Sequence, residues 1–145
     1  MALHLIKLCV GADSVDDLLS WQKQRLADMK RRGVEVMLRH TTRQMPRRRD
    51  DILDGGSLYW VIKGEIACRQ RVVDLRARVD DEGIERCDIC LDSATIRVDP
   101  RPRGPFQGWR YFKTEDAPAD LGASGGDAPE FPETLRRELR ALGVL

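Results

Sequence analysis

The chain has 145 residues, of which 41% are hydrophobic and 34% are charged, and its formal net charge is +1. This length suits one domain with a sizeable core, and the longest apolar stretch is far too short to span a bilayer. The first residues lack the long apolar segment of a secretory signal, so we expect a cytoplasmic protein without membrane association, whose four cysteines are reduced.

Hydrophobic periodicity and turn residues divide the chain into helices and strands. Ser14 and Asp17 have the spacing of a helix capping box, and Gly33 is expected to end the same helix. Apolar and polar residues alternate from Val73 to Val79, which is typical of a half-buried strand. The expected elements are a strand at 3–10, a helix between Ser14 and Gly33, a strand at 34–42, a short helix from Pro46 to about Leu53, strands at 57–63, 66–79, 84–91, 94–98 and 109–113, and a C-terminal helix.

The close spacing of the strands predicts an α+β fold. We expect a small, mostly antiparallel β-barrel, flanked by an N-terminal helix, a short crossover helix and a C-terminal helix. The Gly/Pro-rich stretch at 99–105 is expected to be a loop. Residues 1–115 are predicted to form a single domain, residues 116–130 a flexible linker, and residues 131–145 a helix that packs on the domain.

Charge is segregated along the chain. Residues 22–49 hold ten basic and two acidic side chains, a net charge of +8. Residues 114–133 hold six acidic and no basic side chains, a net charge of −6. A chain of this kind can present one basic face while it stays near neutral as a whole.

Cations alternate with aromatic residues between positions 41 and 71 and again near position 109. Nucleic-acid surfaces need both, because cations hold phosphates and rings stack on bases. In the strand at 57–63, Tyr59 shares a face with Lys63 and Trp60 lies on the opposite face, so at most one of the two rings is expected to face the core. The predicted nucleic-acid-binding residues are Arg43, Arg47, Arg48, Trp60, Lys63, Arg69, Arg71, Trp109 and Arg110.

Other residues that carry chemistry have simpler interpretations. Cys87 and Cys90 form a Cys-x-x-Cys pair, but positions three apart on a strand point to opposite faces, so we interpret both as structural. His40 could act as a general base or a phosphate donor, and a half-exposed strand histidine explains it as well. We predict no metal site and no cofactor, and we leave the catalytic residues unassigned.

Two stretches carry a resemblance to known families. The string from Thr42 to Arg48 (TRxxPxR), together with the string from Gly55 to Gly64 (GGSLYWVIKG) and Arg69-Gln70, resembles a family of small alphaproteobacterial proteins known as a domain of unknown function. This resemblance covers nearly the whole chain and implies a bacterial cytoplasmic protein, with no particular chemistry. The order of the elements is also similar to that of PUA-like barrels of the ASCH and EVE groups, which implies binding of RNA or modified bases. The chain lacks the Gly-x-Lys-x-x-Glu-x-Arg string of the ASCH group, so no site residue is carried over.

The leading hypothesis is therefore an RNA- or nucleotide-binding domain that uses a basic and aromatic barrel rim, between Arg43–Arg49 and Lys63–Arg71. One alternative is a small enzyme that acts on a nucleotide or RNA with His40 or an acid at 50–54 as its base. This alternative requires His40 to lie near the Arg43 side chain and Arg69. A third hypothesis is a protein-interaction module without a small ligand.

Overall fold

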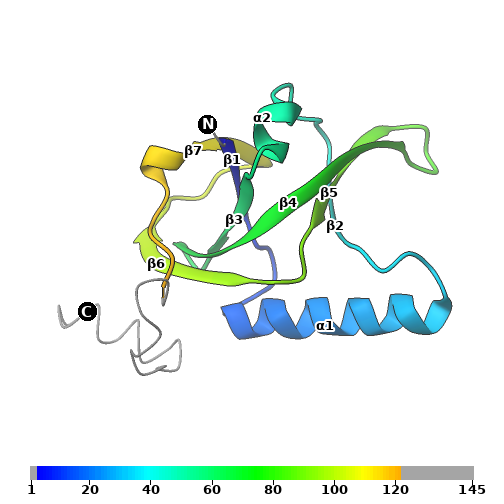
Figure 1. The fold of residues 1–145 in the computed structure, drawn as a ribbon, viewed down its shortest axis with the longest axis horizontal. Helices are drawn as coiled ribbons and strands as arrows, with labels where there is room; N and C mark the ends of the chain where they lie inside the picture. Colours follow the sequence, from blue (N-terminus) through cyan, green and yellow to red (C-terminus); the bar gives the residue numbers. More distant parts are fainter. Residues whose placement is uncertain (1–2, 122–145) are drawn as a thin grey trace.

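Figure 1 shows the fold, which comes from a computed structural model that describes residues 3–121. The described part is an α+β domain in which helices flank one mixed β-sheet. Its elements are β1 (Leu3–Leu8), α1 (Val15–Arg32), β2 (Leu38–Thr42), α2 (Arg49–Leu53), β3 (Ser57–Ile62), β4 (Glu65–Val79), β5 (Glu85–Leu91), β6 (Ile96–Pro102), β7 (Trp109–Lys113) and the 3-10 helix η1 (Thr114–Asp116). The predicted C-terminal helix and most of the predicted linker lie outside the described residues.

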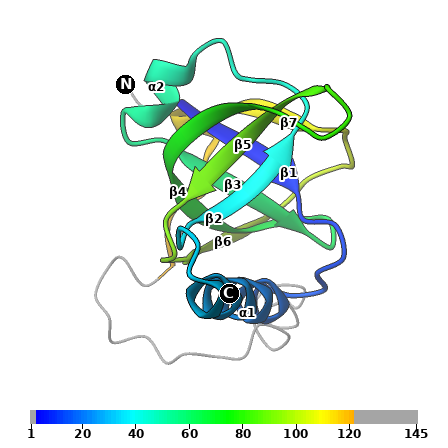
Figure 2. The same ribbon diagram turned by 90° about the vertical axis from the view of Figure 1, so that its right-hand side faces the viewer.

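Helix α1 begins and ends where the sequence predicted. The Ser14 hydroxyl accepts a hydrogen bond from the backbone N–H of Asp17 at 3.1 Å, which satisfies one of the free donors of the first turn. Gly33 ends the helix with a left-handed φ of 70°, a conformation that suits glycine. Only Val15 and Leu18 of α1 are buried, because the helix lies below one open end of the sheet in Figures 1 and 2. No helix within residues 3–121 has the length and apolar character needed to cross a membrane.

The seven strands form an open sheet with the order β2-β5-β4-β3-β1-β7, and β6 pairs with β4 outside this path. Only the β1–β3 pair is parallel, so the sheet is mostly antiparallel, as expected. The sheet does not close into the expected barrel, since its two end strands, β2 and β7, are not paired with each other. Strand β1 is paired with β3 and β7 along both edges, so only β7 could close the sheet onto β2, and these two strands are not paired.

Strand β4 bends the sheet around the core. Its first half pairs with β6 and its second half with β5 along the same edge, with a register shift between Val72 and Asp74. Helix α2 covers the other edge of the second half, where the Arg49 guanidinium donates to the Leu75 carbonyl oxygen at 3.0 Å. The two halves of β4 therefore belong to two differently oriented parts of one sheet. Figure 2 shows that the sheet curls around the core.

Both faces of β3 are buried, which differs from the expectation for Tyr59 and Trp60. The two rings point to opposite faces as predicted, but Tyr59 is 4% exposed and Trp60 is 3% exposed. Trp60 belongs to the main core inside the curled sheet, whereas Tyr59 packs with Val98 and Phe112 in a second, outer cluster. The sequence prediction was wrong because side chains from β6, β7 and the segments that flank β7, such as Val98, Phe106 and Ala117, build a second core on the outer face.

Strand β6 runs through part of the stretch that was expected to be a loop. It includes Pro100 and Pro102, and its pairing with β4 has a register shift around Pro100. Proline, which lacks an N–H donor, is tolerated at such irregular positions and on outer strands. The chain then returns beside β6, where Asp120 bridges to Val98, so the first residues of the predicted linker are paired with the sheet.

Gly56 offers a direct test of this packing. A Cβ atom there would lie 2.2 Å from the Leu3 carbonyl oxygen and 2.5 Å from the Ile52 carbonyl oxygen, so Gly56→Ala forces two backbone segments apart. We expect a loss of about 2 kcal/mol or more in the free energy of unfolding, measured by urea denaturation. Gly104→Ala is the matched control, because a Cβ atom at Gly104 meets nothing within 4 Å. Equal stability of the two variants would contradict the close approach at Gly56.

Candidate functional site

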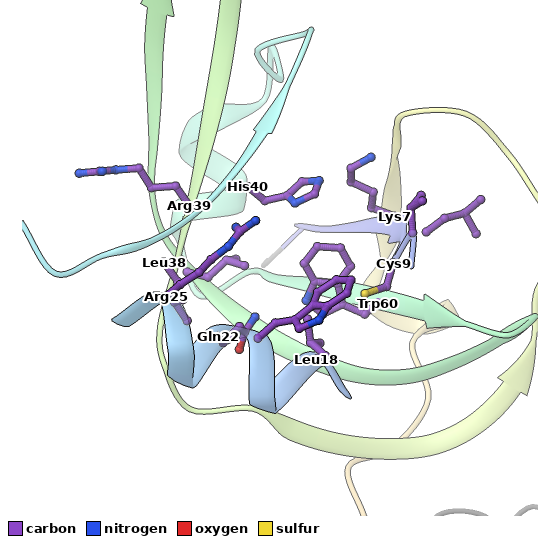
Figure 3. Close-up of a pocket in the computed structure, with 13 residues that line it drawn as sticks. Lys7, Cys9, Leu18, Gln22, Arg25, Leu38, Arg39, His40 and Trp60 are labelled. Carbon is purple, nitrogen blue, oxygen red and sulfur yellow. The ribbon is translucent and has the colours of Figure 1, made fainter. Parts of the chain in front are cut away.

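The open seam of the sheet contains a pocket. It lies between the end of β1, one face of α1 and the edge strand β2, and it encloses a cavity of about 180 Å³. Figure 3 shows that side chains from all three elements point into it. The lining residues are Lys7, Leu8, Cys9, Val10, Leu18, Trp21, Gln22, Arg25, Leu38, Arg39, His40, Trp60 and Leu91.

A hydrogen-bonded network fixes the wall formed by Trp60. The indole N–H donates to Oε1 of Gln70 at 2.9 Å, and Gln70 is fully buried. The amides of Gln70 and Gln22 pair in both directions, at 2.7 Å and 2.8 Å, and the Gln70 amide also donates to the Asp92 carbonyl oxygen. Because these buried polar groups satisfy one another, the indole ring is held in one orientation and α1 is tied to the sheet.

His40 lies between two cations and an aromatic ring. Its imidazole meets the Trp60 ring edge to face, with the ring centroids 5.1 Å apart. Figure 3 shows the Lys7 and Arg25 side chains on either side of His40. Burial, and then the charges of Lys7 and Arg25, lower the pKa of His40 to about 4, so the imidazole is neutral at pH 7. A neutral imidazole can donate one hydrogen bond and accept another.

Two of the three cations that line the pocket have no acidic partner among the described residues. None of the thirteen lining residues is acidic. Within residues 3–121, neither Lys7 nor Arg25 has a carboxylate within 4 Å, whereas Arg39 is paired with Glu35. Burial lowers the pKa of Lys7, because a charged ammonium loses hydration there. The pocket is therefore a partly dry, positively charged space that suits an anion.

Cys9, the one thiol that lines the pocket, is not an activated nucleophile. Burial raises the pKa of the Cys9 thiol to about 11, so the sulfur is protonated at neutral pH. The described residues contain no group of three or more His, Cys, Asp or Glu side chains placed to hold a metal ion. Cys87 and Cys90 are buried free thiols, and Cys87 packs in the main core, which fits the structural role expected for this pair.

Trp21 forms the exposed rim of the pocket. Its side chain is 42% exposed, and its ring lies over the Gly11 turn, where an added Cβ atom would come within 2.9 Å of the indole. Gly11 also has a φ of 92°, which favours glycine. The turn and the helix together place an aromatic face at the entrance.

The predicted site residues do not gather in one place. Trp60 alone among them lines the pocket. Arg43, Arg47 and Arg48 are exposed in and after the turn that follows β2. Trp109 lies beside this turn, because its indole N–H donates to the Gln44 carbonyl oxygen at 2.9 Å. Trp109 thus closes the seam on one side of the pocket.

Arg69 has a structural partner and lies away from the pocket. Its guanidinium binds both carboxylate oxygens of Asp120, at 2.8 Å and 2.7 Å, and donates to the Ser57 hydroxyl at 2.8 Å. Arg69 adjoins Tyr59 in the outer layer, whereas His40 faces Trp60 inside the sheet. His40 and Arg69 are therefore on opposite faces of the sheet and do not share one site. Arg71 is exposed opposite Ser57.

Lys63 and Arg110 lie at the end of the sheet where β1 and β3 finish. Lys63 is in the β3–β4 turn with a φ of 49°, and its ammonium is 3.8 Å from an Asp13 carboxylate oxygen. Arg110 is exposed on β7, opposite Ile6 of β1. Both residues are near the Leu8–Val10 side of the pocket and do not line it.

The residues that sequence reasoning missed are Lys7, Cys9, Trp21, Gln22 and Arg25. Two signals pointed to them. Lys7 is the one cation in a strand of leucine, isoleucine and histidine, and a half-buried ammonium there calls for a partner. Leu18, Gln22 and Arg25 have the spacing of one helix face, so the apolar stripe of α1 continues into polar residues.

These features define a small α+β protein with an open sheet and a cationic, aromatic pocket in its seam. The chain belongs to the family described as proteins of unknown function, DUF1489, whose model matches residues 5–145. Comparison with curated proteins and comparison with solved structures give no match.

The lowered pKa of His40 predicts acid sensitivity. The unfolded chain takes up a proton near pH 6.5, whereas the folded chain resists protonation until about pH 4, so His40 costs stability as the pH falls between these values. His40→Phe lacks this titrating group, so its unfolding free energy should fall less than that of the wild type when the pH drops from 7 to 4. We expect the gap between the two proteins to change by about 2 to 3 kcal/mol in favour of the variant. Urea denaturation at both pH values measures it. A difference that stays constant with pH would show that His40 is not buried in its neutral form.

Proposed function

We propose that the protein binds RNA or a nucleotide in the seam pocket. In this proposal one base enters the cavity, and its phosphate is held by Lys7 and Arg25. The observation that carries the proposal is the pair of cations, Lys7 and Arg25, that have no acidic partner within residues 3–121 and lie at the mouth of an aromatic cavity. We also propose that the fold is related to PUA-like barrels. In this view the ligand enters at the open edge of the sheet, beside β2.

The electrostatics of Lys7 and Arg25 favour a phosphate over a neutral ligand. Removing an ammonium from water costs free energy unless an opposite charge replaces the lost hydration. Lys7 bears part of this cost, as its lowered pKa indicates. A bound phosphate would supply the missing counter-charge and accept hydrogen bonds from both side chains.

The shape and lining of the cavity favour a single flat ring system. Pockets for drug-sized ligands usually measure about 300–1,000 Å³, whereas this cavity measures about 180 Å³. Trp21 presents an exposed aromatic face, Trp60 forms part of the cavity wall, and stacking of a base on an aromatic ring contributes about 1–3 kcal/mol. His40 adds one donor and one acceptor that can bind the edge of a base.

Replacement of the two cations tests the proposal. Lys7→Gln and Arg25→Gln each remove one charge from the pocket, and each is expected to weaken binding by about tenfold or more, because a charge-assisted hydrogen bond contributes about 1.5–3 kcal/mol. Arg31→Gln is the matched control on the same helix, since Arg31 is exposed and pairs with Asp28. Filter binding with single-stranded RNA and DNA, together with calorimetry on mononucleotides, measures the affinities at low and moderate salt.

Two results would contradict the proposal. One is the absence of affinity for RNA, single-stranded DNA and mononucleotides at low salt. The other is an affinity that Arg31→Gln lowers as much as Lys7→Gln and Arg25→Gln do, since the attraction would then be a general effect of charge.

A further inference from the structure

A second group of cations surrounds an aromatic ring next to the pocket. Arg103 and Arg110 both place their guanidinium groups over Phe106, with the guanidinium carbons 5.3 Å and 5.7 Å from the ring centroid. Arg110 also donates to the Gln107 and Trp109 carbonyl oxygens, at 2.7 Å and 3.1 Å. Stacking and backbone contacts thus restrain two long side chains that would otherwise be mobile. We call these three residues the Arg–Phe cluster.

The end of β1 separates the Arg–Phe cluster from the pocket. Lys7, which lines the pocket, is paired with Trp109, and the next pair along the two strands is Ile6 with Arg110. Phe106 packs against the same outer hydrophobic cluster as Leu8, and Leu8 is also a lining residue of the pocket. The pocket and the Arg–Phe cluster therefore lie on either side of the end of β1, with Leu8 in contact with both surroundings.

The cluster has positive charge to offer to a ligand. Within residues 3–121, neither Arg103 nor Arg110 has a carboxylate within 4 Å. The backbone N–H of Arg103 donates to the Gly64 carbonyl oxygen at 2.8 Å, which brings the cluster next to Lys63. The contact of Lys63 with Asp13 is exposed and long at 3.8 Å, so it competes weakly with a bound anion.

We propose that the Arg–Phe cluster binds the phosphate backbone of a single-stranded RNA whose neighbouring base occupies the seam pocket. This inference rests on the proposed function and extends it from a nucleotide to a strand. Guanidinium groups match phosphate oxygens in two-point contacts, and restrained arginines lose less entropy on binding. Arginine planes also stack on unpaired bases, a contact that a flexible acidic peptide does not provide.

The test compares a strand with a mononucleotide. In Arg103→Gln/Arg110→Gln, we expect binding of a single-stranded RNA oligonucleotide to weaken by about tenfold or more at low salt. The slope of log affinity against log salt should become less steep by about 1.4, since each phosphate contact on a single strand contributes about 0.7. Binding of a mononucleotide in the pocket should be unchanged. Arg31→Gln/Arg32→Gln, which removes the same charge from the far end of α1, is the control and should change the RNA slope little.

The possible failures are distinguishable. If the wild type binds the mononucleotide and the double variant binds RNA as the wild type does, the cluster proposal is overturned and the pocket proposal stands. If neither RNA nor the mononucleotide binds to the wild type, both proposals fall. If the cluster variant loses affinity for an acidic polypeptide but keeps its affinity for RNA, the surface serves a protein partner and the RNA assignment is wrong. Both arginines are on the surface, and thermal unfolding verifies that the variant is folded.

Discussion

The pairing of β1 on both edges is the constraint from which the other features follow. Because β3 and β7 take up its backbone hydrogen bonds, β1 cannot pair with β2, and β7, which ends the sheet, is not paired with β2 either. The curled sheet therefore keeps a seam, and side chains close it in place of a backbone ladder. Trp109 bridges to the turn after β2 on one side, and α1 lies across the other. The pocket is the part of the seam that neither of them fills.

The buried pair of Gln70 and Trp60 makes the pocket a fixed feature. Gln70 has no exposed surface, so its amide must find hydrogen-bond partners inside the protein. It finds them in Trp60, in Gln22 of α1 and in the chain after β5. One side chain thus ties together the sheet, the helix and the wall of the pocket. The cations at the mouth are then held at a defined place relative to an aromatic surface.

The sequence was most informative where the determinants are local. The caps of α1 at Ser14 and Gly33, the long strand β4 and the α+β class follow from the spacing of residues, and the structure has them. The opposite orientation of Tyr59 and Trp60 follows from the period of a strand. Closure of the sheet could not be predicted, because it depends on which strand pairs with β1, and that choice is made between distant parts of the chain.

The site was predicted poorly for a related reason. Dense runs of arginine drew attention to positions 43–49, where the side chains are exposed or paired with acids such as Asp51 and Asp74. The pocket instead takes one cation from a strand and one from a helix, Lys7 and Arg25, which are isolated in the sequence. Arg69 looked basic and available, but its charge is neutralised by Asp120, 51 positions later. Only the fold shows which cations lack an acidic partner among residues 3–121.

The central claim is that the open seam between β1 and β2 is where a ligand enters. Backbone and indole amide chemical shifts, followed by NMR during titration with a mononucleotide, test it most directly. We expect the largest changes at Lys7, Cys9, His40 and the Trp60 indole N–H, with smaller changes along α1 near Arg25. Changes confined to residues 43–49, or to the outer face of β5 around Asp88, would place the ligand elsewhere and contradict the claim.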